Sequence, residues 1–263
     1  GSATSASSSA SRTSRSMSLT DSGLIALDYA NRIIEEGTAV EAERSEQVAS
    51  VRGRVRVAAP MSFGLSHVAP ALPGFMAKFP EVSLDMEFND ALVDLVQGRF
   101  DLAIRISNLS DSSLLARRLC TVRILLVGSP NYFKQYGKPK HPRDLANHRA
   151  LQYAYSPSGT NWRFTHSLHG EFTQVVHAPL RINNAEALEP ALHAGLGLAL
   201  QPEFLAWQHI EAGKLETVLE DWQAEPIALH LVTPPGRRRP ARVQALIDYF
   251  YDYFTKKPWA GES

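Results

Sequence analysis

Ser62 is the first side chain whose type and position indicate chemistry. It follows residues 53–60 (GRVRVAAP), in which alternating apolar residues before a proline predict a strand with Val55 and Val57 buried. The backbone N–H groups of a following helix would point into the crevice at the end of that strand and attract an anion. The serine could instead cap the helix. Ser62 is therefore a candidate ligand contact or a candidate N-cap.

Polar side chains also follow the next two predicted strands, over residues 82–88 and 101–106. The carboxyl ends of parallel strands lie at one edge of a sheet, so these side chains are expected near Ser62. Turn formation alone would also explain the asparagine and the aspartate, and the arginine could face outward from its strand. The candidates at this edge are Phe63, Asn89, Asp90, Arg105, Ile106 and Ser107.

A second set of residues is expected to form the opposite wall of the crevice. These residues follow predicted strands over 151–155 and 198–201, or stand just before a helix that begins near residue 185. The second asparagine could be only a helix N-cap, and the proline could be only the start of a helix. The candidates are Tyr153, Asn183, Asn184, Pro202 and Phe204.

The sequence gives no support for catalysis, a metal or a cofactor. Ser62 lacks the Gly-x-Ser-x-Gly elbow, and no flanking sequence designates a His/Asp pair that would activate it. His166 and His169 could bring two imidazoles together, but only Glu171 lies at metal spacing, so a solvated loop is favoured. Residues 195–197 (GLG) lack the third glycine of a dinucleotide motif and precede a strand, which indicates a tight turn.

Composition excludes further classes of function. Lysine plus arginine number 27, as do aspartate plus glutamate, so no net positive charge holds nucleic acid by counterion release. Cys120 is the single cysteine, which excludes an internal disulfide and suits a reducing compartment, the cytoplasm. We expect it to be a small buried side chain, although nearby arginines would favour its thiolate. No apolar run reaches the roughly 18 residues of a membrane span, and the start lacks a signal sequence.

The elements that must position these residues alternate between strand and helix, with strands expected to be parallel and joined by right-handed crossovers. They form two lobes joined by two crossings, a hinge architecture that can close on a ligand. A last strand and helix should return to the first lobe. The remaining predicted elements are helices at 66–79, 91–96, 130–137, 185–193 and 203–212, strands at 123–128, 172–176 and 227–232, and a final helix that buries Val243, Leu246, Ile247, Phe250 and Phe254.

The first part of the chain differs in composition from the rest. Residues 1–18 contain nine serines and almost no apolar side chains, so they are expected to be disordered, and Gly1-Ser2 is typical of a cloning remnant. Residues 24–46 show apolar residues at helical spacing among many charges, which predicts one long amphipathic helix. This helix is expected to pair with another helix, although a solvent-exposed linker is the alternative.

Several short motifs, in order and spacing, resemble the LysR-type transcriptional regulators. The resemblance covers nearly everything from Leu19 onward and implies the two-lobed fold of the type 2 periplasmic binding proteins. It also marks Ser62 and residues 202–204 as effector contacts. The motifs are 18–23 (SLTDSG), 53–60 (GRVRVAAP), 100–106 (FDLAIRI), 129–132 (SPNY), 141–145 (HPRDL), 195–202 (GLGLALQP) and 234–237 (PPGR).

The resemblance also implies a division of the chain. Arg12 and Arg15 would be DNA-contacting residues in the remnant of a winged helix-turn-helix, but only residues 1–11 precede them, without helical periodicity. We therefore expect contact with promoter DNA only through the full-length protein. The expected parts are a tail over 1–18, a linker and dimerisation helix over 19–50, a first lobe over 53–128 and 227–256, and a second lobe over 129–226.

The expected function is that of a cytoplasmic regulatory module, not an enzyme, that senses a small and anionic organic molecule in the cleft. The ligand would shift the lobes through its different affinity for two states. In the family such helices pair between subunits, so a homodimer or tetramer is expected. The alternative is a solute-binding protein of a transporter, against which the missing export signal and the long helix argue. A hydrolase or transferase that uses Ser62 is a third hypothesis.

Overall fold

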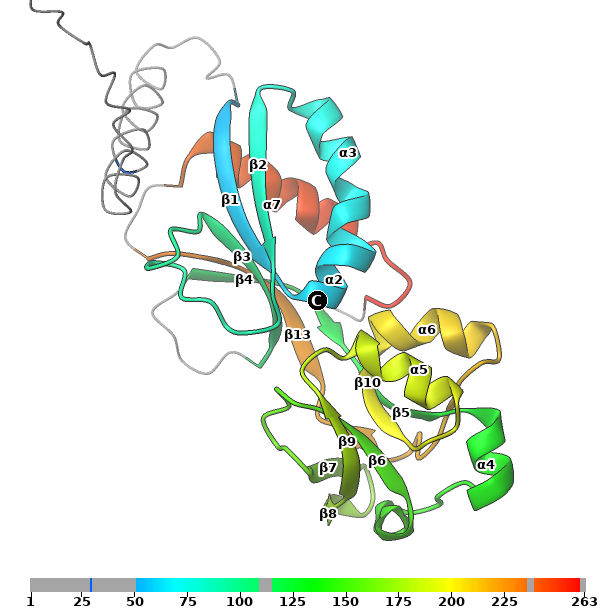
Figure 1. Cartoon of the computed structure of the whole chain (residues 1–263). Coiled ribbons are helices and arrows are strands. Elements are labelled where there is room, and N and C mark those ends of the chain that lie inside the picture. Colours follow the sequence, from blue (N-terminus) through cyan, green and yellow to red (C-terminus); the bar gives the residue numbers. More distant parts are fainter. Residues whose placement is uncertain (1–28, 30–50, 109–114, 236–238, 261–263) are drawn as a thin grey trace, which may run out of the picture. The chain divides into compact units, whose positions relative to one another are not determined.

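The computed structural model describes residue 29 and residues 51–108, 115–235 and 239–260 (Figure 1). The chain divides into two compact units, Gly1–Ser50 and Val51–Ser263. In the first unit only Tyr29 is described, and it is helical. The predicted tail and all other residues of the predicted helix over 24–46 lie outside the described residues.

A five-stranded sheet in the order β2-β1-β3-β13-β4 forms the first half of this unit. Strands β1 (Gly53–Ala59), β2 (Val82–Phe88) and β3 (Leu102–Ser107) are parallel, as predicted. By contrast, β13 (Ile227–Thr233) runs antiparallel to both β3 and β4 (Leu115–Val122). The sheet is therefore mixed, because the late strand enters from the second half of the chain and not through a crossover helix.

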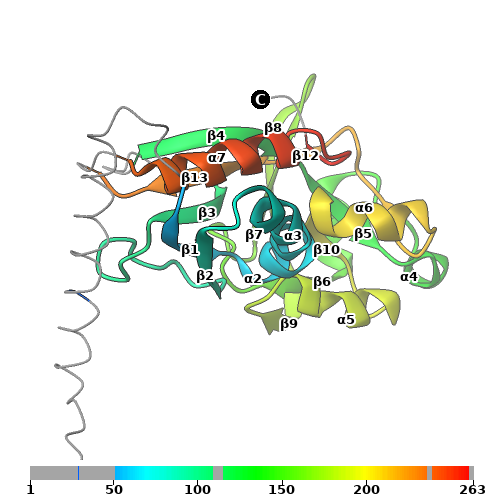
Figure 2. The ribbon, with the colours of Figure 1, turned by 90° about the horizontal axis from the view of Figure 1, so that it is seen from above.

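Helices α3 (Ala69–Lys78) and α7 (Ala241–Phe254) pack on one face of this sheet (Figures 1 and 2). The alternation of β1 turns Val55 and Val57 into the core on this face, where both are fully buried. The predicted apolar face of α7 is confirmed, since all five of its side chains are buried: Val243, Leu246, Ile247, Phe250 and Phe254.

The second half contains three smaller sheets. One has the order β10-β5-β11, another has the order β12-β7-β8, and the third pairs β6 with β9 in parallel. The predicted boundary of the first lobe lies at residue 128, after β5, although the partners of β5 belong to the second half. The strands are β5 (Ile124–Gly128), β6 (Arg149–Tyr153), β7 (Asn161–His166), β8 (Gly170–Val175), β9 (His177–Ile182), β10 (Ala199–Pro202), β11 (Glu216–Thr217) and β12 (Gln223–Ala224).

Short helices cover these smaller sheets (Figure 1). The second half contains two core clusters of its own, whereas Phe204 and Leu205, from the last of the short helices, belong to the cluster that α7 covers. Trp162 and Phe164 of β7 belong to one cluster, and Leu188 and Leu192 belong to the other. The helices are α4 (Pro130–Tyr136), the 3-10 helices η2 (Pro142–Asn147) and η3 (Glu186–Leu188), α5 (Glu189–His193) and α6 (Glu203–Glu211).

The first helical segment begins five residues before its predicted start at residue 66. Helix α2 (Met61–Phe63) leads into a π-helical turn, η1 (Gly64–Val68), and then into α3. The carboxylate of Asp90 accepts a hydrogen bond from the Met61 backbone N–H, with an oxygen–nitrogen distance of 2.8 Å. A residue from beyond β2 thus satisfies the first amide of the helix, and no local sequence signal marks that start.

The helix predicted over 91–96 is wrong, because side chains there take the backbone amides that a helix would use. Asn89 Oδ1 accepts a hydrogen bond from the Ala91 N–H, and Asp94 Oδ1 accepts from the amides of Val96 and Gln97. Short polar side chains compete with helical hydrogen bonds in this way. The segment forms turns.

Besides the two-residue strands β11 and β12, three strands were not predicted: β4, β7 and β9. The first four residues of β4 are exposed, so they show no alternation between buried and exposed side chains. Strand β7 does alternate, with Trp162 and Phe164 buried, and this pattern was available in the sequence. Strand β9 contains Pro179, a residue that argues against a central strand, and it pairs only with β6 among the described residues.

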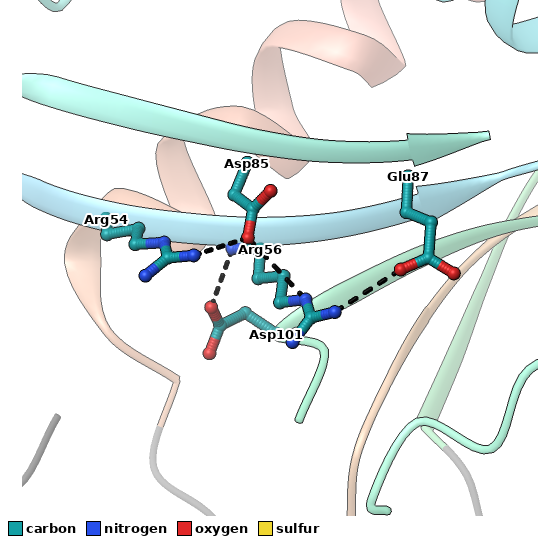
Figure 3. A network of polar contacts seen from close by, with 5 residues as sticks. All are labelled: Arg54, Arg56, Asp85, Glu87 and Asp101. Atoms are coloured by element: carbon teal, nitrogen blue, oxygen red, sulfur yellow. Dashed lines mark hydrogen bonds and ion pairs between the residues drawn. The ribbon is translucent and has the colours of Figure 1, made fainter. Parts of the chain in front are cut away.

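Figure 3 shows a charged network on the face of β1 opposite its buried valines. Arg54 Nη2 lies 2.6 Å from Asp85 Oδ2, and Arg56 Nη2 lies 3.3 Å from Glu87 Oε2. The Arg56 backbone N–H donates to the carboxylate of Asp101. The paired side chains are partly exposed, so each pair stabilises the fold by about 1 kcal/mol or less. The pairs also link the side chains of the neighbouring parallel strands β1 and β2.

Three histidines are held in surroundings that disfavour their charged form. Burial is the main cause that lowers the pKa of His67, His148 and His230 below the ordinary histidine value of 6.5. His148 Nδ1 is hydrogen-bonded to the hydroxyl of Tyr132 at 2.9 Å. Each imidazole therefore packs as a neutral ring.

We expect the free energy of unfolding to fall as the pH is lowered from about 7.5 to about 5.5. Below the ordinary value of 6.5 the unfolded chain takes up protons before these folded histidines do, which favours unfolding. The loss should level off below the folded pKa values. Urea unfolding followed by circular dichroism at each pH measures it.

His148→Gln should make this pH profile shallower, whereas His177→Gln, which changes an exposed histidine of β9, is the matched control. A free energy of unfolding that stays constant over the same pH range in the unmodified chain would contradict the prediction.

Candidate functional site

A hydrogen-bonded cluster joins the two halves of the structure. The side-chain amide nitrogen of Asn184 donates to Ser62 Oγ at 3.0 Å and to Asp90 Oδ2 at 2.7 Å. Ser62 lies in α2, Asp90 follows β2, and Asn184 follows β9. Three of the predicted site residues, far apart in the sequence, are thus in direct contact.

The same side chains also organise the local backbone. Asp90 Oδ1 accepts from the Met61 N–H, and Asn184 Oδ1 accepts from the Ala187 N–H at the start of η3. The carbonyl oxygen of Asn184 thus binds a backbone amide of η3, although Ala185 holds the N-cap position, and the amide nitrogen of Asn184 reaches the other half. Ser62 is not the N-cap, since Pro60 holds that position and Asp90 supplies the acceptor.

Asp90 occupies the place that the sequence predicts for an anion. Its carboxylate lies against the first backbone amide of the segment that runs through α2 and η1 into α3, where negative charge is favoured. The chain thus supplies its own carboxylate to the predicted anion position, and a negatively charged ligand would have to compete with Asp90 there.

Tyr153, at the end of β6, lies within the field of this carboxylate. Burial is the first cause that raises the pKa of its phenol, followed by the negative charge of Asp90 and by Tyr155. The hydroxyl is therefore protonated at neutral pH and able to donate a hydrogen bond. Tyr153 is half-buried.

Gln201 was not predicted as a site residue, yet its side chain approaches the same loop. Its Nε2 donates to the backbone carbonyl of Ala185 at 2.9 Å, next to Asn184 in the chain. The residue is buried, and its Oε1 has no hydrogen-bond partner among the described residues. A buried amide oxygen without a donor costs about 1–3 kcal/mol.

Phe63 and Phe204, which the sequence suggests as effector contacts, both pack in the core. Their rings lie 5.2 Å apart in an edge-to-face arrangement, and both are buried. Trp259 packs edge-on against both rings. This aromatic cluster joins α2 to α6.

His67, in the π-helical turn, completes the aromatic cluster and was also not predicted. Its ring lies 4.9 Å from Trp259, and its Nε2 is 3.2 Å from the backbone carbonyl oxygen of Phe204. Because a carbonyl only accepts, Nε2 must carry the proton. A lone histidine on a helix gives no signal in the sequence that its partner is a backbone carbonyl in α6.

The remaining predicted residues make no hydrogen bond to the cluster of Ser62, Asp90 and Asn184 among the described contacts. Arg105 donates to the Val93 carbonyl on the other face of the sheet, in keeping with the outward orientation left open by the sequence. Others serve the local fold: Asn89 caps a turn, Ile106 packs against the core, Ser107 ends β3, Asn183 is exposed and Pro202 stands between β10 and α6.

Two histidines singled out in the sequence lie beside a separate pocket. The rings of His166 and His169 lie 4.5 Å apart, and both contact Trp222. With His141 they help to line a pocket of about 450 Å³. His166 Nδ1 accepts hydrogen bonds from the backbone amides of Leu168 and His169, so its ring also stabilises the β7–β8 turn.

Cys120 is a small buried side chain, as the sequence predicts. The residue is buried in the core beneath the five-stranded sheet. Burial raises the pKa of the thiol to about 11, against a smaller opposite effect of Arg118. The thiol is therefore protonated at neutral pH and a poor nucleophile.

Two further predictions concern DNA and membranes. Arg12 and Arg15, expected to contact DNA, lie outside the described residues. Within the described ranges, no helix has both the length and the apolar character that a membrane crossing requires.

Comparison with known proteins identifies the fold. Residues 49–255 match the family model of the LysR substrate binding domain. An uncharacterized HTH-type transcriptional regulator of Haemophilus influenzae is 31% identical over 235 residues, which cover 89% of this chain and 81% of that protein. An HTH-type transcriptional regulator of Xanthomonas campestris pv. campestris is 33% identical over 241 residues, which cover 90% of this chain and 70% of that protein.

A solved structure agrees with these relatives. The full-length Vibrio cholerae virulence activator AphB, described as a member of the LTTR protein family, superposes with a TM-score of 0.70 at 25% identity. The superposition covers 92% of this chain and 83% of AphB. The predicted α/β fold of the type 2 periplasmic-binding-protein kind is thus confirmed, and a transporter's solute-binding protein is not favoured. The chain belongs to the LysR substrate-binding domain family, the effector-binding regulatory module of LysR-type transcriptional regulators.

Proposed function

We propose that a small anionic organic effector binds at the cluster of Ser62, Asp90 and Asn184 and so controls a transcription regulator. The observation that carries this proposal is the pair of hydrogen bonds from the Asn184 amide to Ser62 and Asp90. One side chain joins the sheet of β1 and β2 to the loop after β9. A ligand that takes over either bond changes how the two halves are held together.

The cluster offers the groups that a carboxylate ligand needs. The Asn184 amide, the Ser62 hydroxyl and the protonated phenol of Tyr153 are neutral hydrogen-bond donors, and the Met61 N–H is a backbone donor. At present Asp90 accepts from two of these donors. An anionic effector would replace Asp90. The net free energy of binding therefore depends on how much more strongly these donors bind the effector's carboxylate than the carboxylate of Asp90.

The proposed signal is a shift between two arrangements of the lobes. We place the boundaries between the lobes near residues 123 and 227. An effector changes that equilibrium only to the extent that it binds one arrangement more tightly. The shift would then reach the DNA-reading part of the full-length regulator through the segment over 19–50. We include a DNA-reading part because the relatives are named as HTH-type transcriptional regulators.

A thermal-shift screen of carboxylates, aromatic acids and amino acids should find an effector that raises the melting temperature. A ligand that binds only the folded state adds about 2.7 kcal/mol at a hundred times its dissociation constant. Ser62→Ala and Asn184→Ala should abolish the shift. Asn183→Ala is the matched control, because this neighbouring amide is exposed and outside the cluster.

Asp90→Asn separates an anionic effector from other ligand classes within the same screen. Loss of a competing negative charge should tighten the binding of an anion by about tenfold, equivalent to about 1.4 kcal/mol. Weaker binding in Asp90→Asn would instead mean that the ligand donates to the carboxylate, and the proposal of an anionic effector would be wrong. A hit that survives Asn184→Ala would move the site elsewhere.

We also propose that the module is not an enzyme, so an active-serine phosphonate probe should leave Ser62 unlabelled. Ser62 Oγ accepts a hydrogen bond from an amide that cannot serve as a base, whereas a nucleophilic serine needs a general base beside it. Mass spectrometry of the intact chain after incubation with the probe measures labelling. A stoichiometric adduct that disappears in Ser62→Ala would revive the hydrolase hypothesis.

A homodimer in the bacterial cytoplasm, where promoter DNA lies, is the assembly that we propose. It rests on the helix predicted over 24–46, whose apolar residues at helical spacing include Leu27 and Ile34. Light scattering should give twice the chain mass, and Leu27→Glu with Ile34→Glu should give the monomer. A strict monomer in the unmodified chain at micromolar concentration would count against the dimer.

A further inference from the structure

Glu189, His193 and His209 form a cluster whose chemistry the effector site does not use. Each offers one ligand atom, and these atoms all lie within 4.8 Å of one another. Glu189 and His193 are four residues apart in α5, so they lie on one face of that helix. His209 comes from the last turn of α6, and Figures 1 and 2 both show α5 near α6.

The three side chains already contact one another. His209 Nε2 lies 3.3 Å from Glu189 Oε2, and the rings of His193 and His209 lie 4.8 Å apart at an angle of 58°. The side chains of His209 and Glu189 are 26% and 22% exposed. Half-buried ligands of this kind have lost part of their water shell but leave a route for an ion.

His193 also has a partner outside the cluster, since its ring is hydrogen-bonded to the backbone of Lys214. Metal-bound histidines commonly donate their second ring nitrogen to a backbone carbonyl in this way.

Two helix ends add a favourable field for a cation. His193 is the last residue of α5, and His209 precedes the end of α6 at Glu211 by two residues. The carbonyl ends of helices attract positive charge within their last turn.

We propose that Glu189, His193 and His209 bind a zinc ion, with water in the fourth position. Two imidazoles and one carboxylate form a donor set that Zn²⁺ takes in tetrahedral sites with an open position. Mg²⁺ and Ca²⁺ prefer oxygen ligands, so they are poor occupants. Tetrahedral bonds of about 2.0–2.2 Å place neighbouring ligand atoms roughly 3.3–3.6 Å apart. His209 Nε2 and Glu189 Oε2 already lie 3.3 Å apart.

The ion would tie together two elements that flank the candidate effector site. Helix α5 follows η3, whose backbone is bound by the side chain of Asn184, and α6 begins beside the aromatic cluster at Phe204. Bound zinc would restrain α5 against α6. The proposal does not depend on the identity of the effector, because metal binding is measured without one.

Zinc titration by calorimetry into the chelator-treated chain should show binding of one ion at this site. His193→Gln and His209→Gln should each weaken that binding by more than about a hundredfold, beyond the loss typical of an outer-shell partner. His177→Gln, which changes an exposed histidine of β9, should leave it unchanged. Mg²⁺ should give no binding.

His166→Gln with His169→Gln tests the other histidine cluster. Zinc binding that disappears in this variant but persists in His193→Gln and His209→Gln would overturn the proposal. X-ray absorption of the zinc-loaded unmodified chain gives a readout that does not rely on variants that fold. Two imidazole nitrogens and a carboxylate oxygen around the metal are expected, and a shell of oxygens alone would equally overturn the proposal.

Discussion

The amide of Asn184 is the contact on which the arrangement of the two halves depends. It donates both hydrogens across from the loop after β9 to Ser62 and Asp90, while its carbonyl oxygen binds a backbone amide of η3. Both donor hydrogens of this side chain thus serve a joint between separately folded sheets. Such a joint is strong enough to define one arrangement and weak enough for a ligand to replace, because the bond to the Ser62 hydroxyl contributes about 1 kcal/mol net and the bond to the Asp90 carboxylate about 1.5–3 kcal/mol.

The joint has a second, apolar part that behaves differently. Phe63, His67, Phe204 and Trp259 pack where α2 and η1 meet α6, and the His67 ring also holds the Phe204 carbonyl. Because these rings are largely removed from water, they resist separation, whereas the polar cluster can exchange partners. The π-helical turn at η1 brings His67 into this packing, and such turns are frequent at functional sites.

The sequence predicts those parts of the fold that have local signals. The alternating apolar residues of β1 and β2 and the apolar face of α7 are patterns of neighbouring residues, and the structure confirms both strands and the helix. The start of α2 could not be predicted, because its capping carboxylate, Asp90, comes from beyond another strand. The antiparallel entry of β13 depends on the pairing of distant segments in the same way.

The candidate site likewise contains some residues that could be predicted from the sequence and others that could not. Ser62 and Asp90 could be predicted because each follows a predicted strand, and residues at strand ends meet at one edge. Asn184 could be predicted because it stands just before a predicted helix. Phe63 and Phe204 also come shortly after strands. Their apolar rings pack into the core, where burial removes them from water. His67 and Gln201 escaped prediction because their partners are backbone carbonyls, and any residue type could supply those.

The charges on β2 bear on how copies of the protein can associate. This strand lies at one edge of the five-stranded sheet, and it carries Asp85 and Glu87, which the arginines of β1 hold in place. Strand β4, at the opposite edge, exposes Arg117 and Arg118. Charged side chains on edge strands discourage the addition of a further strand from another molecule. The sheet is thereby protected against growth into an open-ended aggregate, and ordered self-association is left to other surfaces.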